Sequence, residues 1–234
     1  MKKNFRIFIC IIIALACVIA FLNFNLTTRQ GVDYKVSVIK IPLYLKVLDF
    51  FDRHYNYKQL VRSITEGAKN DDERVTRIFN WTYEHIKKQP DELPVIDDHV
   101  WNIIVRGYGK DDQSCDVFST LCNYAGFRSF YDYIPLARSS GQMILSYVNI
   151  KGLWYVFDPY NGVFFVNEKN TYASIGDIKK GNWRLGQSDL KNEFIPDYKE
   201  SIASIVKLKQ VGLCRENIQS PLRRILFELQ KKRE

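Results

Sequence analysis

The sequence predicts an α+β fold behind a single N-terminal membrane-spanning helix, and three observations support this prediction. An uninterrupted apolar run occupies residues 7–22. Apolar residues then recur at helical spacing in two stretches, 75–86 and 112–125. After residue 126 the period shortens to two, which is typical of strands, and a helical period returns after residue 201. This order indicates helices packed on an antiparallel sheet.

The N-terminal apolar segment is long enough to cross a membrane. Residues 7–26 contain no charge, and a bilayer core is about 30 Å thick. Lys2, Lys3 and Arg6 precede the segment, which predicts a cytoplasmic N-terminus and export of everything after about residue 27. We therefore expect a single-pass protein of the cell membrane whose main domain lies outside the cytoplasm.

A cleaved signal peptide is the alternative reading of this segment. Ala14-Leu15-Ala16 is a small-residue site of the kind that signal peptidases accept. With Cys17 it also distantly resembles a bacterial lipoprotein box. Cleavage sites are usually followed by polar sequence, whereas here the apolar run continues to Leu22. The continuation favours an uncleaved anchor.

The formal net charge of +8 is concentrated at the two ends of the 234-residue chain. Residues 1–30 carry +4 and residues 201–234 carry +5, which leaves −1 for residues 31–200. These ranges are also the expected domains: a basic stub with the anchor, a globular domain, and C-terminal amphipathic helices that pack on the domain or face the membrane. The central domain is not basic, so we expect no nucleic-acid partner.

Local signals place the elements of the globular domain. Residues 31–58 read only as a juxtamembrane segment with a mixed apolar stretch. Asn70 marks a helix start, Gly126 a helix end, and Lys151-Gly152 a hairpin turn. The remaining expectations are a loop at 91–98, a short helix at 100–104, a turn at 107–109, strands at 127–135, 142–150, 153–158 and 163–166, and a C-terminal helix capped at Ser220-Pro221.

Three motifs in fixed order suggest a family. They are RIFNWTY at 77–83, RGYGKDDQ at 106–113, and GLWYVFDP at 152–159. In this order and spacing the stretch from Val75 to Pro159 resembles the transglutaminase-like superfamily, which shares the papain-like cysteine-protease architecture. The resemblance implies a Cys nucleophile at the start of a buried helix, a His on the following strand and an Asp on the next.

The residues at these three positions do not match the implied triad. The positions fall on Asp111, Gln142 and Asp158, so that only the third member is retained. A carboxylate cannot replace a thiolate in acyl transfer, and a glutamine cannot shuttle a proton at neutral pH. We therefore expect a catalytically inactive domain, a pseudoenzyme that acts as a binding or scaffolding module of the bacterial cell envelope.

The enzymatic alternative is a divergent hydrolase or acyltransferase acting on peptide or amide substrates. In one version Cys115, which follows Asp111 by one helical turn, is the nucleophile of this enzyme. In the other version Asp111 and Asp158 act as a carboxylate pair. Gln113 and Trp154 are the expected walls of the cleft. A purely structural partner in an envelope assembly complex is a third reading.

We expect no cofactor and no metal site. The imidazoles, His54, His85 and His99, are scattered, and a solvated loop explains His99 beside Asp97 and Asp98 better than a metal site does. The expected partners are the membrane through residues 7–26, a peptide, amine or glycan ligand in the cleft, and an envelope protein.

Overall fold

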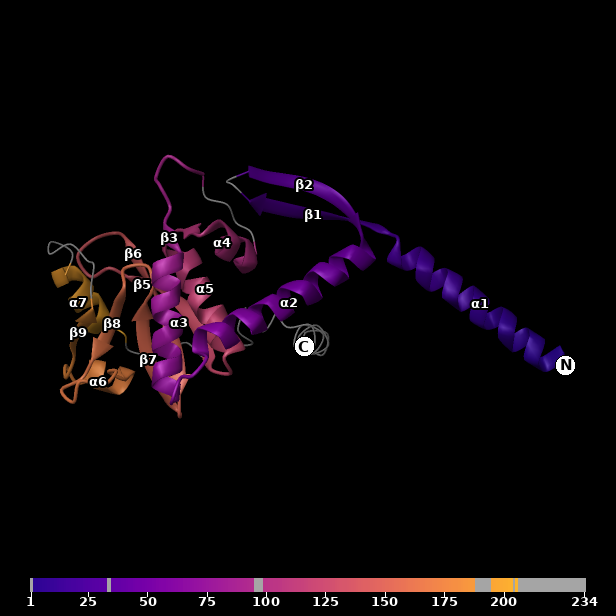
Figure 1. The fold of residues 1–234 in the computed structure, drawn as a ribbon. Coiled ribbons are helices and arrows are strands. Elements are labelled where there is room, and N and C mark those ends of the chain that lie inside the picture. The colour runs from indigo at the N-terminus through magenta and orange to yellow at the C-terminus, as the bar shows by residue number, and fades with distance from the viewer. Residues whose placement is uncertain (1, 33–34, 95–98, 188–194, 204, 206–234) are drawn as a thin grey trace.

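The computed structural model describes residues 2–32, 35–94, 99–187, 195–203 and 205 (Figure 1). The helices are α1 (Lys2–Leu22), α2 (Leu43–Thr65), α3 (Asp71–His85), α4 (Val100–Arg106), α5 (Asp111–Tyr124), α6 (Ile175–Lys179) and α7 (Ile195–Ala203). The strands are β1 (Asn25–Val32), β2 (Lys35–Pro42), β3 (Lys87–Lys88), β4 (Tyr108–Gly109), β5 (Arg128–Pro135), β6 (Gln142–Ile150), β7 (Leu153–Asp158), β8 (Val163–Val166) and β9 (Arg184–Gln187).

Helix α1 extends away from the rest of the molecule (Figure 1). Its segment Asn4–Leu22 is long and apolar enough to cross a membrane, and none of that segment is buried inside the protein. A signal sequence passes the same test of length and composition. The lack of burial means that α1 is not a core helix of the folded domain.

Three elements, β1, β2 and α2, span residues 25–65 and so cover residues 31–58, to which the sequence assigned no secondary structure. Strands β1 and β2 pair as an antiparallel hairpin from Asn25↔Pro42 to Val32↔Lys35, and α2 follows directly. Helix α2 carries apolar side chains on more than one face, so it shows no single helical stripe that would reveal it.

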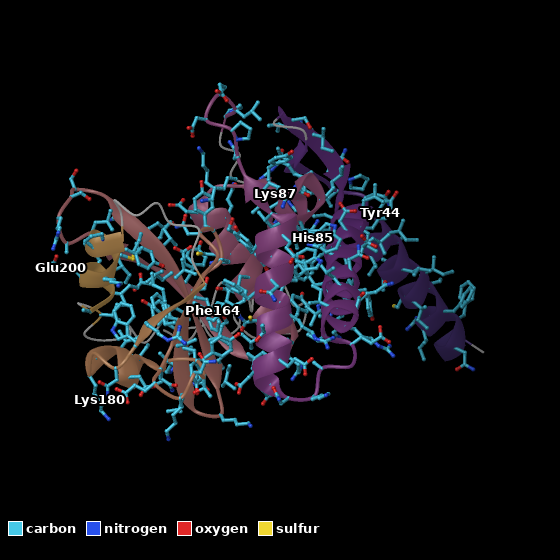
Figure 2. All side chains as sticks on the ribbon, turned by 60° about the vertical axis from the view of Figure 1, so that its left-hand side comes forward. Tyr44, His85, Lys87, Phe164, Lys180 and Glu200 are labelled. Atoms are coloured by element: carbon cyan, nitrogen blue, oxygen red, sulfur yellow. The ribbon has the colours of Figure 1, made fainter. Side chains whose placement is uncertain are left out.

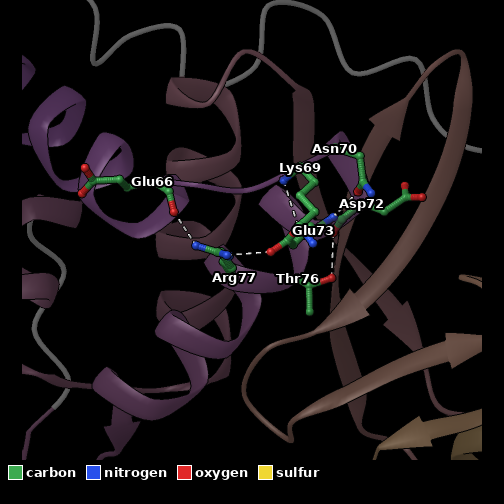
Figure 3. Close-up of polar contacts among 7 residues, drawn as sticks. All are labelled: Glu66, Lys69, Asn70, Asp72, Glu73, Thr76 and Arg77. Atoms are coloured by element: carbon green, nitrogen blue, oxygen red, sulfur yellow. Dashed lines mark hydrogen bonds and ion pairs between the residues drawn. The ribbon is translucent and has the colours of Figure 1, made fainter.

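Helix α3 begins where the sequence predicts. The Asn70 side chain accepts a hydrogen bond from the Glu73 backbone N–H at 2.8 Å, which is an N-cap (Figure 3). Glu73 in turn accepts from the Lys69 backbone N–H at 2.8 Å and pairs with Arg77 at 2.6 Å. Arg77 also donates to the Glu66 carbonyl and thereby ties α3 to the end of α2.

The main sheet is antiparallel and has the order β5-β6-β7-β8-β9. Strand β6 shows how it divides the core, because successive side chains point to opposite faces. Val148 and Ile150 belong to the cluster shared with α2–α5, whereas Leu145 and Tyr147 belong to the cluster shared with α6 and α7. Helices thus cover both faces of the sheet, and the predicted α+β class with helices packed on an antiparallel sheet is confirmed.

Helix α5 is the central helix of the domain. All of its residues from Gln113 to Cys122 are buried, since it lies between α2, α3 and α4 on one side and β5 and β6 on the other. Cys115 and Cys122 are both fully buried on this helix. The two ends of α5, at residues 111–112 and 123–124, are partly exposed.

Some sequence expectations differ from the structure or fall outside it. Residues 108–109 form strand β4, parallel to β3, and Gly107 alone (φ 72°) supplies the expected turn by ending α4. Helix α6 and strand β9 were not predicted. Residues 95–98 and the expected cap at Ser220-Pro221 lie outside the described residues.

Candidate active-site pocket

A small pocket lies where α5 begins, β6 begins and β7 ends. Its volume is about 160 Å³. The residues that line it are Asp111, Leu136, Gln142, Met143, Ile144, Asp158, Tyr160, Asn161 and Tyr198. The structure therefore brings Asp111, Gln142 and Asp158 to one pocket, although they lie up to 47 positions apart in the sequence.

Asp111 enters the pocket from the first turn of α5. Its Oδ1 atom accepts a hydrogen bond from the Asp112 backbone N–H at 2.9 Å. An acidic side chain is stabilised here because the free N–H groups of a helix start carry partial positive charge. The Gln113 side chain folds back toward the residue before the helix, where its Oε1 atom accepts a hydrogen bond from the Lys110 backbone N–H at 3.1 Å.

Asp158 is the most enclosed carboxylate of the pocket, with 2% of its surface exposed. Oδ1 accepts from the backbone N–H groups of Tyr160 (3.1 Å) and Asn161 (3.0 Å). Oδ2 accepts from Asn161 Nδ2 (2.9 Å) and from the Tyr198 hydroxyl (3.0 Å). Burial raises the pKa of Asp158, while the hydrogen bonds from Asn161 and Tyr198 lower it and offset part of that rise.

Tyr198 closes the pocket from α7. Its ring is 4% exposed and lies nearly parallel to Phe165, with ring centroids 6.3 Å apart. Ser201 on the same helix accepts from the Ala137 backbone N–H at 2.8 Å, which fixes α7 beside the loop after β5. Tyr198 lies 40 positions from Asp158 and carries no sequence signal that would have placed it in the site.

Cys115 lies behind the wall of the pocket. Its Sγ donates to the carbonyl of Ile144, a lining residue, at 3.5 Å, and the side chain is fully buried. Burial raises the pKa of the Cys115 thiol well above its ordinary value, and the negative charge of Asp158 raises it further. The thiol is therefore held in the protonated form, which is a poor nucleophile.

The remaining predicted site residues lie outside the pocket lining. Trp154 packs edge-on against Phe130, with ring centroids 5.2 Å apart, and the Arg128 guanidinium lies 5.6 Å from the Trp154 ring centroid. Gln113 is buried at the start of α5 as a backbone cap. Neither forms a wall of this pocket, because each side chain is directed into a local contact instead.

The imidazoles of the chain are engaged elsewhere. His54 is hydrogen-bonded to the Tyr124 hydroxyl at 3.0 Å, and His85 stacks on Trp81 with ring centroids 4.5 Å apart. His99 occupies the position that precedes α4. Among the described residues, no Cys or His lines the pocket, and no group of three or more His, Cys, Asp or Glu could hold a metal ion.

A second, more open hollow of about 460 Å³ lies over β8 and β9. Its lining includes Phe164, Tyr172 and Arg184. None of the predicted site residues contributes to it. The smaller pocket is therefore the one to which the motifs of the sequence lead.

Comparison with known families agrees with the motifs. Residues 58–159 match the sequence model of the transglutaminase-like superfamily, and this part of the chain is a transglutaminase-like domain. The match begins inside α2, so α1, the β1–β2 hairpin and the first half of α2 lie outside it. No curated protein sequence matches the chain.

Three solved structures match part of the chain at low sequence identity. A candidate protease from Parabacteroides distasonis is 12% identical, with a TM-score of 0.37 over 58% of this chain and 36% of that one. A candidate cysteine protease from Cytophaga hutchinsonii is 14% identical, with a TM-score of 0.41 over 58% and 48%. A protein named as a TGase is 8% identical, with a TM-score of 0.38 over 57% and 43%. The matched region spans less than half the length of each.

Proposed function

We propose that this protein is a membrane-anchored binding module of the bacterial cell envelope whose transglutaminase-like domain is catalytically inactive. The observation that carries the proposal is the lining of the pocket. Asp111 and Gln142 occupy the positions that the resemblance assigns to the nucleophile and the base, and both line the pocket beside Asp158. The pocket is kept while the groups that would perform thiol chemistry are replaced.

The chemistry of these side chains supports binding rather than acyl transfer. A carboxylate at position 111 can accept hydrogen bonds and attract a cation, and the Gln142 amide can donate and accept. Neither side chain supplies a thiolate nucleophile, and the Gln142 amide cannot cycle a proton at neutral pH as an imidazole does. Cys115, the nearest thiol, is buried behind Ile144 and lacks an imidazole partner in the described residues around it.

The size and charge of the pocket limit the kinds of ligand that it could bind. A volume of about 160 Å³ is below the ~300 Å³ at which pockets for whole small molecules begin. It fits one side chain or one small head group of a larger peptide, amine or glycan. The Asp111 carboxylate in its lining favours a group that carries a primary amine, because an ammonium donates charge-assisted hydrogen bonds to such an acceptor.

The chain organisation forms part of the proposal. In this proposal residues 1–30 form a cytoplasmic stub and an uncleaved membrane anchor, and residues 31–200 form the exported domain. Helix α7 crosses the boundary at residue 200, and Ile202 and Ile205 are buried in the core, so the proposed domain extends to at least residue 205. The residues after 205 lie outside the described part of the chain. For them we keep the prediction of amphipathic helices that pack on the domain or face the membrane.

Titration with small probes tests the binding proposal. The full chain in detergent micelles is titrated with n-butylammonium and with its uncharged counterpart n-butyramide, followed by NMR of the protein amides. We expect n-butylammonium to shift the signals of the lining residues, and Asp111→Asn to weaken its binding by about tenfold, which corresponds to ~1.4 kcal/mol. Asp91→Asn is the matched control, since that carboxylate is 98% exposed and lies outside the lining.

Two results would contradict the binding proposal. One is the absence of shifts at the lining residues with either probe. The other is an equal loss of affinity in Asp111→Asn and Asp91→Asn, which would indicate a nonspecific surface charge effect.

A carboxylate-dependent hydrolase or acyltransferase is the second candidate, and one observation favours it. Asp111 and Asp158 share the pocket, and burial raises the pKa of Asp158, as a general acid requires. Peptide-amide hydrolysis that is abolished by Asp111→Ala but kept in Cys115→Ala would select this candidate. The four hydrogen bonds to Asp158 favour a structural role for it instead, because they occupy both carboxylate oxygens.

A further inference from the structure

Helix α2 is apolar on the side that packs on the domain. Tyr57 is fully buried and Val61 is 5% exposed. The Tyr57 ring stacks on Tyr124, with ring centroids 4.8 Å apart, and meets Trp101 edge-on at 5.1 Å. These contacts fix the C-terminal half of α2 to the helices α4 and α5.

The other side of α2 carries a second apolar row that is exposed. Tyr44, Leu48, Phe51 and Tyr55 follow one another at intervals of four, three and four residues, which places them on one face over three turns. Their exposed fractions are 39%, 58%, 43% and 62%. Val47 adds a fifth exposed apolar side chain at the edge of this face, which we call the outer face of α2.

The outer face changes character along the helix. Lys58 and Arg62 continue the same spacing after Tyr55, and both are exposed. Lys58 Nζ lies 5.9 Å from the centroid of the Tyr55 ring. The face is therefore aromatic and aliphatic in its first three turns and cationic in the next.

The apolar end of this face lies beside the end of the membrane helix. The Leu43 backbone N–H donates to the Phe24 carbonyl at 2.9 Å, directly beyond α1, and Lys46 Nζ donates to the Thr27 carbonyl at 3.3 Å. These two bonds hold the first turn of α2 at the base of the hairpin. Figure 1 shows α1 and α2 meeting there, and Figure 2 shows Tyr44 on the side of the molecule away from Glu200 of α7.

We infer that the outer face of α2 lies on an anionic lipid surface, with Tyr44, Leu48, Phe51 and Tyr55 at the boundary between acyl chains and headgroups. Lys58 and Arg62 then reach the phosphate groups as the helix continues toward the domain. Tyrosines are enriched at this depth, and basic residues near it are attracted to anionic lipids. The inference rests on the proposed membrane anchor.

The order of residues on the outer face favours lipid over a second copy of the chain. Parallel pairing of two α2 helices would set Lys58 against Lys58 and Arg62 against Arg62, which is repulsive. Antiparallel pairing would cover part of the apolar row with these cations. A lipid surface can contact both parts of the outer face, because its apolar interior suits the aromatic and aliphatic side chains and its anionic headgroups suit Lys58 and Arg62.

This contact would set the orientation of the domain. The Tyr57 side of α2 is packed on the domain, and its outer face would lie on the membrane, so one rigid helix of about 35 Å joins the two. Helix α7, which carries Tyr198 of the pocket, lies at the end of the molecule opposite α1 (Figure 1). The pocket would then be held away from the anchor.

Spin-label accessibility tests the inference in the full chain. Cys10, Cys17 and Cys214 are replaced by Ser, and a nitroxide is attached to Leu48→Cys or Phe51→Cys in vesicles of phosphatidylcholine and phosphatidylglycerol. We expect both labels to be relaxed by oxygen more than by a water-soluble nickel chelate. Ser63→Cys is the matched control on an exposed position of the same helix outside the outer face, and its label should show the reverse.

Each outcome of this experiment has a distinct meaning. A label at the native Cys17, in a variant that keeps it, reports whether α1 is in lipid. If that label is in lipid and the Leu48 label is in water, the inference is overturned and the anchor stands; if the Cys17 label is in water, the anchor itself fails. Spin–spin broadening at Leu48 that grows with protein per vesicle would show a second copy on this face, and would also overturn the inference.

Discussion

The hydrogen bond from Tyr198 to Asp158 offers a quantitative test of how the pocket is closed. Tyr198→Phe removes the hydroxyl that donates to Asp158 Oδ2 at 3.0 Å and leaves the ring against Phe165. A hydrogen bond to a charged group contributes about 1.5 to 3 kcal/mol. Asn161 still donates to Oδ2, so no acceptor is orphaned, and we expect a loss near the lower end of that range.

The pH dependence of this loss follows from the pKa of Asp158. That pKa is raised by burial, so between its ordinary and its raised value the native carboxyl binds a proton that the unfolded chain has released. The free energy of unfolding therefore falls as pH rises through this window. Removing the Tyr198 hydroxyl raises the pKa further, because that hydrogen bond lowers it. The cost of Tyr198→Phe should thus be larger at neutral pH than below pH ~3.9, where the carboxyl is protonated in both states.

Urea unfolding of the full chain in detergent, followed by tryptophan fluorescence, measures both effects. Tyr55→Phe is the matched control, since that hydroxyl is on an exposed side chain and its loss should change the free energy of unfolding by less than about 0.5 kcal/mol. The reasoning would be refuted if Tyr198→Phe matched this control at neutral pH. It would also be refuted if the cost were the same at acidic and neutral pH.

Three further predictions concern the cap, the α2 packing and the buried thiol. Asn70→Ala should cost about 1 kcal/mol in urea unfolding because the cap to the Glu73 N–H is lost, while Asn70→Ser should cost much less; equal losses would contradict the cap. Tyr57→Ala should cost about 3 kcal/mol or more and weaken the near-ultraviolet circular dichroism, and a cost under about 1 kcal/mol would contradict its burial. Cys115 should resist iodoacetamide in the native protein even near pH ~8.5 and react in urea, since burial raises its pKa; rapid native alkylation would place it in solvent.

The elements that the sequence predicts well are those whose pattern is local. Strand β6 spans Gln142–Ile150, as its alternation predicts, because each of its faces meets a separate core cluster. Helix α3 starts at its predicted cap, and Lys151 and Gly152 both adopt positive φ in the predicted hairpin turn. In each case the signal lies within a few residues of the structure it determines.

The parts that the sequence did not predict depend on distant contacts. Strand β4 exists because Tyr108 and Gly109 pair with Lys87 and Lys88, about twenty residues earlier. Helix α2 has apolar side chains on opposite faces, so its periodicity is blurred.

The candidate site divides in the same way between local and distant signals. Its family-motif residues Asp111, Gln142 and Asp158 were named from the sequence and line one pocket, and their functional roles remain a prediction. Tyr198 reaches the pocket only through the packing of α7, which no local pattern encodes.

Covalent labelling tests the central proposal of an inactive pocket most directly. The full chain, with Cys10, Cys17 and Cys214 replaced by Ser, is exposed to an acylating probe that forms thioesters with reactive thiolates, and adducts are located by peptide mass spectrometry. We expect no adduct on Cys115, and a new adduct at position 111 in the Asp111→Cys, Gln142→His double variant, because a helix start and a nearby imidazole together favour a thiolate. A thioester on Cys115 in the protein with its native pocket would contradict the proposal and make the domain an enzyme.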